Sequence, residues 1–204
     1  MITIIDYKAG NIASIQNMLK KVGVTSVISD KADEIRVAEK LILPGVGHFD
    51  HGMEKLQASG LIGVLNQRVL QDKVPILGIC LGLQLFTRGS EEGNTPGLGW
   101  FAADTVRFNL DKGNEHLKIP HMGWSDVKIQ QEAPLFQSMP PEPRYYFVHA
   151  YHIKEDNKAD VMVEADYGYT FTAGLQKDNI FGVQFHPEKS HKFGMQLLTN
   201  FANL

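Results

Sequence analysis

The sequence predicts an α/β fold: an open, mixed and mostly parallel central sheet flanked by helices, with additional antiparallel strands in the C-terminal half. Two observations carry this prediction. The first half of the chain alternates short β-branched apolar runs with longer amphipathic runs, a pattern typical of βαβ units. The second half contains shorter strand-like runs, which favour antiparallel pairing. With 204 residues and 43% hydrophobic side chains, the chain is expected to form a single domain over residues 1–204.

The elements of the first half follow from the spacing of their apolar residues. Apolar positions recur at helical spacing after Asn11, which can cap a helix, and again from Leu61. Strands are expected where β-branched and apolar residues run together. The expected strands are Met1–Ile5, Val27–Ser29, Lys40–Leu43 and Val74–Ile79, and the expected helices are Ile12–Val22 and Leu61–Leu70.

The second half predicts several short strands and one closing helix. A Pro-rich segment, residues 134–143, is expected to be a loop that interrupts regular structure. One side of the last helix, Lys192–Phe201, is apolar. The expected strands are Thr105–Phe108, Asp126–Ile129, Tyr145–His149, Val161–Ala165, Thr170–Gln176 and Ile180–Phe185.

Composition excludes several classes of protein. The net charge of -3 is small and the basic residues are scattered, so no nucleic-acid partner is expected. No apolar run reaches the roughly 20 residues that span a bilayer, and the N-terminus lacks the features of a signal peptide. We therefore expect a cytoplasmic protein with no membrane contact. The single cysteine and the histidine pairs His48/His51 and His149/His152 lack partners at metal-ligand spacing, so no metal site is predicted.

The single cysteine stands where a buried strand gives way to a helix. Cys80 is flanked by Gly78 and Gly82, the Gly-x-nucleophile-x-Gly arrangement of a nucleophile elbow. The glycines allow a strained turn with close backbone approach, and the N-terminus of the helix lowers the pKa of a thiol. The N–H of Leu81 is then a candidate oxyanion donor. A lone cysteine is more often a small buried hydrophobic residue, but the paired glycines favour a nucleophile.

An apolar strand near the C-terminus ends in His186-Pro187-Glu188. A thiol nucleophile needs an imidazole to take its proton, and the imidazole needs a carboxylate to hold its tautomer. Side chains at the carboxyl end of a strand reach the sheet edge where α/β proteins bind ligands. The predicted catalytic triad is therefore Cys80, His186 and Glu188. A surface turn would explain His-Pro-Glu equally well without the cysteine motif.

A third motif, Pro44-Gly45-Val46-Gly47, follows another expected strand. Glycines on both sides of Val46 let the backbone approach a ligand and rotate a peptide, so that an N–H can point at a developing oxyanion. A plain turn is the commoner role of Pro-Gly.

In order and spacing, these three motifs resemble those of the class I, triad-type glutamine amidotransferases, whose sheet is flavodoxin-like. A closer resemblance is to the glutaminase subunits of imidazole glycerol phosphate synthase, in histidine biosynthesis. The segments that carry it are Asp6-Tyr7, Gly10-Asn11, His121-Met-Gly-Trp124, Tyr145-Tyr-Phe-Val-His149 and His186-Pro-Glu-Lys-Ser190. It extends over nearly the whole chain.

The resemblance implies a glutaminase that needs no cofactor and passes ammonia to a (β/α)8-barrel cyclase subunit in a heterodimer. It implies that Val46, Gly47 and Leu81 form the oxyanion hole. The residues implied to bind glutamine are Gly45, Gln84, Glu92, His149, Ala150 and Tyr151, and those implied to face the partner are Asn11, Met122, Trp124 and Lys189.

Two positions depart from the pattern. Lys8 replaces an expected glycine, and Ser125 replaces an expected asparagine, both in segments near the implied partner face. A related glutaminase subunit that feeds ammonia to a sugar-amidinating synthase of surface polysaccharides would look very similar. Two further alternatives are another cysteine-elbow enzyme, such as a peptidase or glyoxalase-like hydrolase, and an interaction subunit without activity.

Overall fold

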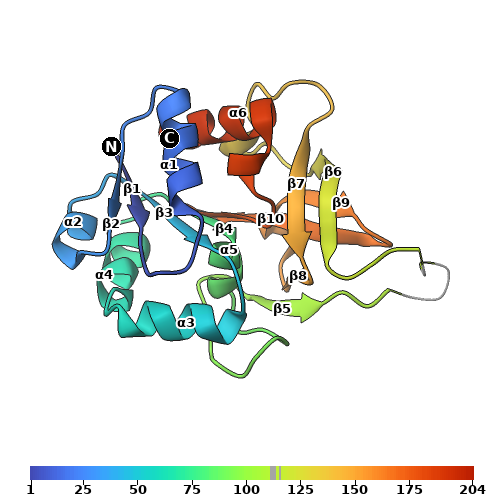
Figure 1. The fold of residues 1–204 in the computed structure, drawn as a ribbon, viewed down its shortest axis with the longest axis horizontal. Helices are drawn as coiled ribbons and strands as arrows, with labels where there is room; N and C mark the ends of the chain where they lie inside the picture. Colours follow the sequence, from blue (N-terminus) through green and yellow to red (C-terminus); the bar gives the residue numbers. More distant parts are fainter. Residues whose placement is uncertain (111–113, 115) are drawn as a thin grey trace.

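The computed structural model describes residues 1–110, 114 and 116–204. Within these residues, eleven strands form one sheet with the order β2-β1-β3-β4-β11-β10-β9-β6-β7 (Figure 1). Beside this path, β8 pairs with β10 and β5 pairs with β8. None of the described helices is long and apolar enough to cross a membrane.

The first five strands of this order are parallel to one another. Their apolar side chains alternate between the two faces, so that Ile42 joins one buried cluster while Leu41 and Leu43 join the other. These strands are β1 (Ile2–Ile5), β2 (Ser26–Ser29), β3 (Lys40–Gly45), β4 (Ile76–Cys80) and β11 (Ile180–Val183).

Helices cover both faces of the parallel strands (Figure 1). On one face, α1 (Ile12–Lys21) and α6 (His191–Ala202) bury Ile15, Leu19, Leu197 and Leu198. On the other face lie α3 (Phe49–Ala58), α4 (Ile62–Asn66) and α5 (Leu81–Leu85), with α2 (Ala32–Arg36) packed near the edge. The sheet is therefore the middle layer of three.

The remaining strands pair antiparallel and extend the sheet. They are β5 (Ala103–Arg107), β6 (His121–Ile129), β7 (Arg144–His149), β8 (Tyr151–Glu155), β9 (Val161–Asp166) and β10 (Thr170–Lys177). The predicted fold class is confirmed.

Several boundaries differ from the expected ones. Strand β6 begins at His121 rather than Asp126, and strand β8 was not expected. Helices α2 and α3 were not expected either, because α2 is short and α3 follows a glycine-rich turn. The helix expected directly after Cys80 is α5. The expected helix over residues 61–70 is α4 followed by a π-helical turn, η1 (Gln67–Gln71), and the Pro-rich loop contains a 3₁₀ turn, η2 (Pro134–Phe136).

Asn11 stands at the N-cap position of α1, but its side chain makes no capping bond to a backbone N–H. Its Oδ1 instead accepts a hydrogen bond from the Ser14 hydroxyl at 2.9 Å. The expected position is thus correct and the expected capping contact is wrong, because the nearby hydroxyl competes for the same oxygen.

Candidate active site

Strand β4 ends at Cys80 and helix α5 begins at the next residue. The backbone of Cys80 has φ 54° and ψ -112°, a conformation that L-residues rarely adopt. A Cβ at Gly78 would lie 2.6 Å from the Phe86 ring, and one at Gly82 would overlap the Leu43 carbonyl oxygen. Both flanking glycines are therefore required by close packing around the turn.

Cys80 is buried, with 7% of the residue exposed. Gln184 Nε2 lies 3.7 Å from the sulfur and can donate to it, and the Val148 carbonyl oxygen lies 4.0 Å away. Gln184 is wholly buried, and none of the predicted motifs contains it. The sequence offers one indication of its role. Gln184 is an amide inside the apolar run of residues 180–185, and a buried amide needs hydrogen-bond partners.

His186 and Glu188 form a buried pair directly after this run. His186 Nδ1 lies 2.8 Å from Glu188 Oε1, and the two side chains are 2% and 1% exposed. Since the carboxylate only accepts, Nδ1 carries the proton and Nε2 is the nitrogen left to act as base. Burial alone would lower the pKa of His186, but the neighbouring Cys80 and Glu188 favour the imidazolium and raise this pKa to about 10.

His186 Nε2 is buried and has no hydrogen-bond partner among the described residues. The 3₁₀ turn η4 (Pro187–Lys189) follows it. The Ser190 hydroxyl holds this turn, because it donates to His186 O at 2.6 Å and accepts from Tyr146 N at 3.0 Å. The imidazole is therefore fixed to β7, with Nε2 free to exchange a proton with the reacting groups.

A cavity of about 180 Å³ brings most of the predicted site residues together. Among the described residues that line it, Val148 is the one that the sequence patterns do not single out. Gly45 and Glu188 are not among the lining residues: Gly45 ends β3 directly before Val46, and Glu188 contacts the Nδ1 side of His186. The lining residues are Val46, Gly47, Cys80, Leu81, Gln84, Glu92, Val148, His149, Ala150, Tyr151 and His186.

Glu92 is anchored at the start of α3. Its Oε2 accepts a hydrogen bond from Phe49 N at 2.8 Å, which is the kind of contact that an acidic side chain makes at a helix N-terminus. The carboxylate is thereby held next to the Val46-Gly47 loop that leads into the same helix. Glu92 and this loop therefore occupy one side of the cavity together.

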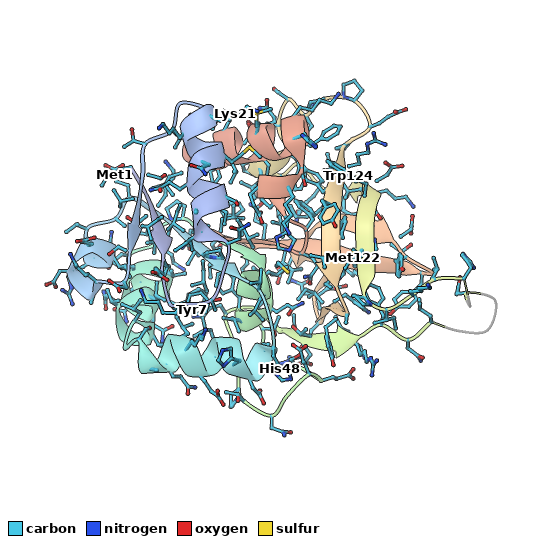
Figure 2. The ribbon with its side chains drawn as sticks, in the orientation of Figure 1. Met1, Tyr7, Lys21, His48, Met122 and Trp124 are labelled. Atoms are coloured by element: carbon cyan, nitrogen blue, oxygen red, sulfur yellow. The ribbon has the colours of Figure 1, made fainter. Side chains whose placement is uncertain are left out.

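The residues predicted to face a partner lie on one exposed surface. Met122 and Trp124 are 62% and 41% exposed and belong to β6 (Figure 2). The Trp124 ring stacks on His191 with centroids 5.5 Å apart, and Lys189 Nζ lies 5.6 Å from the Tyr146 ring centroid. Trp124 and Tyr146 pair across strands β6 and β7. This surface therefore continues from β6 to the residue after Glu188.

Asn11 lies beside this surface, at the start of α1. Ser14, one turn into the helix, lines a groove together with Lys189. Lys8 lies in the preceding loop, with φ 65°, the left-handed conformation that favours glycine. Its ammonium pairs with Asp6 at 2.7 Å and Asp30 at 3.1 Å, so the lysine keeps a glycine-like turn and anchors its side chain to acidic neighbours.

Comparison with known proteins agrees with this geometry. The glutamine amidotransferase class-I family model matches residues 3–203. The chain is 50% identical over 204 residues to imidazole glycerol phosphate synthase subunit HisH 2 of Pseudomonas aeruginosa, covering 100% of both chains. It is also 50% identical over 201 residues to HisH 2 of Methanococcus maripaludis, covering 98% of each, and 43% identical to HisH of Leptospira interrogans, covering 100% of each.

Two solved structures share the fold. A glutamine amidotransferase crystal structure superposes with a TM-score of 0.75 at 16% identity, covering 100% of each chain. The structure of PurLQS from Thermotoga maritima gives 0.73 at 18% identity, covering 99% of this chain and 97% of the other. These structures share the fold, and the relatives that are 43–50% identical, together with the family model, show the family. The chain belongs to the class I glutamine amidotransferase family, and within it to the imidazole glycerol phosphate synthase HisH subunits.

Proposed function

We propose that this chain, acting as one domain in the cytoplasm, hydrolyses glutamine to glutamate and ammonia and delivers the ammonia to the cyclase subunit of imidazole glycerol phosphate synthase. The observation that carries the proposal is that the strained Cys80 thiol and the His186–Glu188 pair border the same small cavity. The names of the relatives favour this synthase over the sugar-amidinating one.

The first chemical step is attack by the Cys80 thiolate on the carbon of the glutamine side-chain amide. The amide oxygen becomes an oxyanion, which the N–H of Leu81 and a loop N–H at Val46 or Gly47 stabilise. His186 then donates a proton to the departing nitrogen, the C–N bond breaks, and ammonia leaves a glutamyl thioester on the sulfur.

The second step is hydrolysis of the thioester. A water molecule attacks the thioester carbon while His186 takes its proton, the C–S bond breaks, and glutamate leaves with the thiolate restored. Glu188 keeps the imidazole in one tautomer and stabilises its charged form in both steps, as its 2.8 Å contact with Nδ1 supports.

The remaining roles concern binding. Gln84 and Glu92 hold the amino-acid end of glutamine, and Gly45 with the backbone of residues 149–151 (His149, Ala150 and Tyr151) completes the pocket. The exposed surface formed by Met122, Trp124, Lys189 and the neighbouring Asn11 docks a (β/α)8-barrel cyclase. The exposure of Met122 and Trp124 supports this role, because large exposed apolar side chains in one patch mark interaction sites.

Glutamate formation by the purified chain, alone and with the partner that co-purifies from native cells, tests the proposal. A glutamine-mimicking electrophile should label Cys80, the single cysteine of the chain, and should not label Cys80→Ala. The partner should also work with free ammonium at high pH when the chain is absent. Substantial glutamine turnover by Cys80→Ala would overturn the mechanism, and peptide or α-ketoaldehyde hydrolysis without glutamine hydrolysis would favour another cysteine-elbow enzyme.

A further inference from the structure

A chain of buried hydrogen bonds outside the triad leads to the Cys80 thiol. Gln184 Nε2 lies 3.7 Å from Sγ, and Gln184 Oε1 accepts from Gln84 Nε2 at 3.1 Å. Gln84 Nε2 also donates to the Tyr151 carbonyl oxygen at 3.3 Å. A carbonyl only accepts, so it orients the Gln84 amide, which in turn orients the Gln184 amide. The end of Gln184 that faces the sulfur is therefore its N–H donor.

Two histidines extend this chain beyond the Tyr151 carbonyl. His149 Nδ1 lies 2.7 Å from that oxygen and must carry a proton, so Nε2 of the neutral ring accepts. His121 Nδ1, 3.1 Å from His149 Nε2, therefore donates, and its own Nε2 accepts from the Ser125 hydroxyl at 2.8 Å. One carbonyl thus fixes the tautomers of both rings and the direction of every bond.

Both histidines are held neutral, as this assignment requires. Burial lowers the pKa of His121 to about 4 and that of His149 to about 3. The rings are also held by aromatic packing, since His121 stacks on Tyr167 with centroids 4.0 Å apart. A neutral, fully bonded network in a buried site is rigid, and breaking one bond leaves an unpaired polar group.

The outer end of the chain lies on β6, directly behind the exposed surface. His121 and Ser125 point inward, while the alternate residues Met122 and Trp124 are exposed. Gly123, between them, has φ 137°, which departs from regular strand geometry. A molecule that contacts Met122 and Trp124 therefore binds one face of β6, while the other face carries Ser125 and His121, where the hydrogen-bond chain begins.

We propose that Ser125, His121 and His149 are positioning residues for the nucleophile. His149 donates to the Tyr151 carbonyl oxygen and so holds in place the acceptor that orients the two glutamine amides. These amides keep an N–H donor at the Cys80 thiolate, and a hydrogen bond of this kind stabilises the charged sulfur. A shift of β6 that breaks the Ser125 bond releases the chain and turns the donor away. This inference rests on the proposed nucleophilic role of Cys80 and adds to it a route by which β6 controls the thiol.

The reactivity of the thiol can be measured without any substrate, because Cys80 is the single cysteine. The rate of alkylation by iodoacetamide against pH reports its thiolate fraction. We expect Gln184→Leu to be alkylated about tenfold more slowly at neutral pH, because the N–H donor that stabilises the thiolate is lost. Ser125→Ala, acting through the chain, should be about threefold slower, while Ser125→Thr keeps the hydroxyl and should restore the wild-type rate.

A matched control is Ser29→Ala on β2, at the far edge of the sheet. Ser29 is 4% exposed and its hydroxyl accepts from Lys31 N at 3.0 Å. Ser29→Ala therefore loses a partly buried serine hydrogen bond, as Ser125→Ala does, but outside the hydrogen-bond chain that leads to Cys80. His186 and Tyr7 are the other described side chains whose pKa responds to Cys80, and all of the variants leave both in place. Alkylation of Ser125→Ala at the same rate as Ser29→Ala would overturn the proposal.

Glutamine kinetics with the native partner provide a second readout. Ser125→Ala should lower kcat/KM about threefold, since the nucleophile and the pocket residues Gln84, His149 and Tyr151 belong to one hydrogen-bonded chain. If the wild-type chain with its partner made no glutamate but its alkylation still depended on Ser125, the proposed function would fail and the positioning chain would stand. If the wild type hydrolysed glutamine but the alkylation rate of Cys80 did not change in Ser125→Ala, only the proposal of a positioning role for Ser125, His121 and His149 would be overturned.

Discussion

Gly45, the last residue of β3, lies directly opposite Cys80, the last residue of β4, in the parallel ladder. The proposed oxyanion loop and the nucleophile therefore leave the sheet side by side. The space beside Gly45 is filled, since a Cβ there would lie 2.6 Å from the Tyr7 hydroxyl and 2.8 Å from Leu81 Cβ. Tyr7 is 1% exposed and packs in the core on this face of the sheet (Figure 2), so it cannot move away easily.

Gly45→Ala should consequently shift either the loop or the Cys80 turn. We expect a loss of about 1–3 kcal/mol in the free energy of unfolding, typical of overpacking, and a fall of about a hundredfold in glutamine turnover, as expected for a misplaced catalytic group. Urea unfolding and glutamate formation measure the two effects. Gly63→Ala in α4, where an added Cβ meets nothing within 4 Å, is the matched control and should lose neither property.

The φ of 54° at Cys80 predicts that the nucleophile reduces stability. Glycine adopts this conformation without a Cβ clash. The free energy of unfolding of Cys80→Gly, measured in urea, should therefore exceed that of Cys80→Ala by about 1 kcal/mol. Both variants should be inactive because both lack the thiol. Equal stability of the two variants would mean that the turn is not strained, whatever their activity.

The pair formed by His186 and Glu188 predicts a pH-dependent stability. The pKa of His186 is raised from its ordinary value of 6.5 to about 10. The folded protein therefore binds a proton more tightly than the unfolded chain, and the resulting stabilisation is complete below pH 6.5 and lost as pH rises through about 10. The difference in unfolding free energy between wild type and Glu188→Gln, measured in urea across this range, should shrink with rising pH. A constant difference would contradict the coupling.

The neutral histidines of the positioning chain predict the opposite behaviour in acid. The pKa of His121 is lowered from 6.5 to about 4 and that of His149 to about 3. As pH falls below 6.5, the unfolded chain takes up protons that the folded protein cannot, so stability should decrease towards pH 4 and be unaffected by these groups above 6.5. His121→Asn should make this decrease shallower, whereas His51→Asn, at an exposed position, should not.

Local sequence signals predicted the parts of the molecule that depend on neighbouring residues. The glycine-flanked Cys80 and the His186-Pro-Glu188 segment were found because backbone geometry restricts which residues fit there. Strand β8 was missed because its burial comes from pairing with β5 and β10, which lie far away in the chain. Helix α3 was missed because its apolar residues follow a glycine-rich turn and are separated by polar ones.

The hydrogen-bond chain that leads to Cys80 could not be predicted from local sequence patterns. Its side chains come from α5, β6, the end of β7 and the residue after β11, and no spacing rule brings Gln184 to Gln84 or His121 to His149. Only the register that places His121 opposite His149 makes that contact predictable. Ser125, which departs from the expected motif, has its partner His121 four residues earlier on the same strand, β6.

The last prediction concerns control by the partner. Unregulated hydrolysis would release ammonia to solvent, so we expect the free chain to be a poor glutaminase. Val46, 46% exposed between two glycines, can rotate its peptide to present or withdraw an oxyanion N–H. Loss of such a donor costs about a hundredfold to a thousandfold in rate, and couplings of about 1–3 kcal/mol are common between distant sites.

Lys189 is the residue through which docking is expected to reach the pocket. Its ammonium lies over the Tyr146 ring on the exposed surface, and its N–H donates to His186 O at 3.0 Å. Lys189→Ala should therefore reduce activation about tenfold while changing partner affinity less. Lys192→Ala, which also removes a lysine lying over an aromatic ring, is the control. Glutamine turnover by the chain alone, with partner, and with partner plus acceptor analogue measures activation, and equal rates in all three states would contradict the switch.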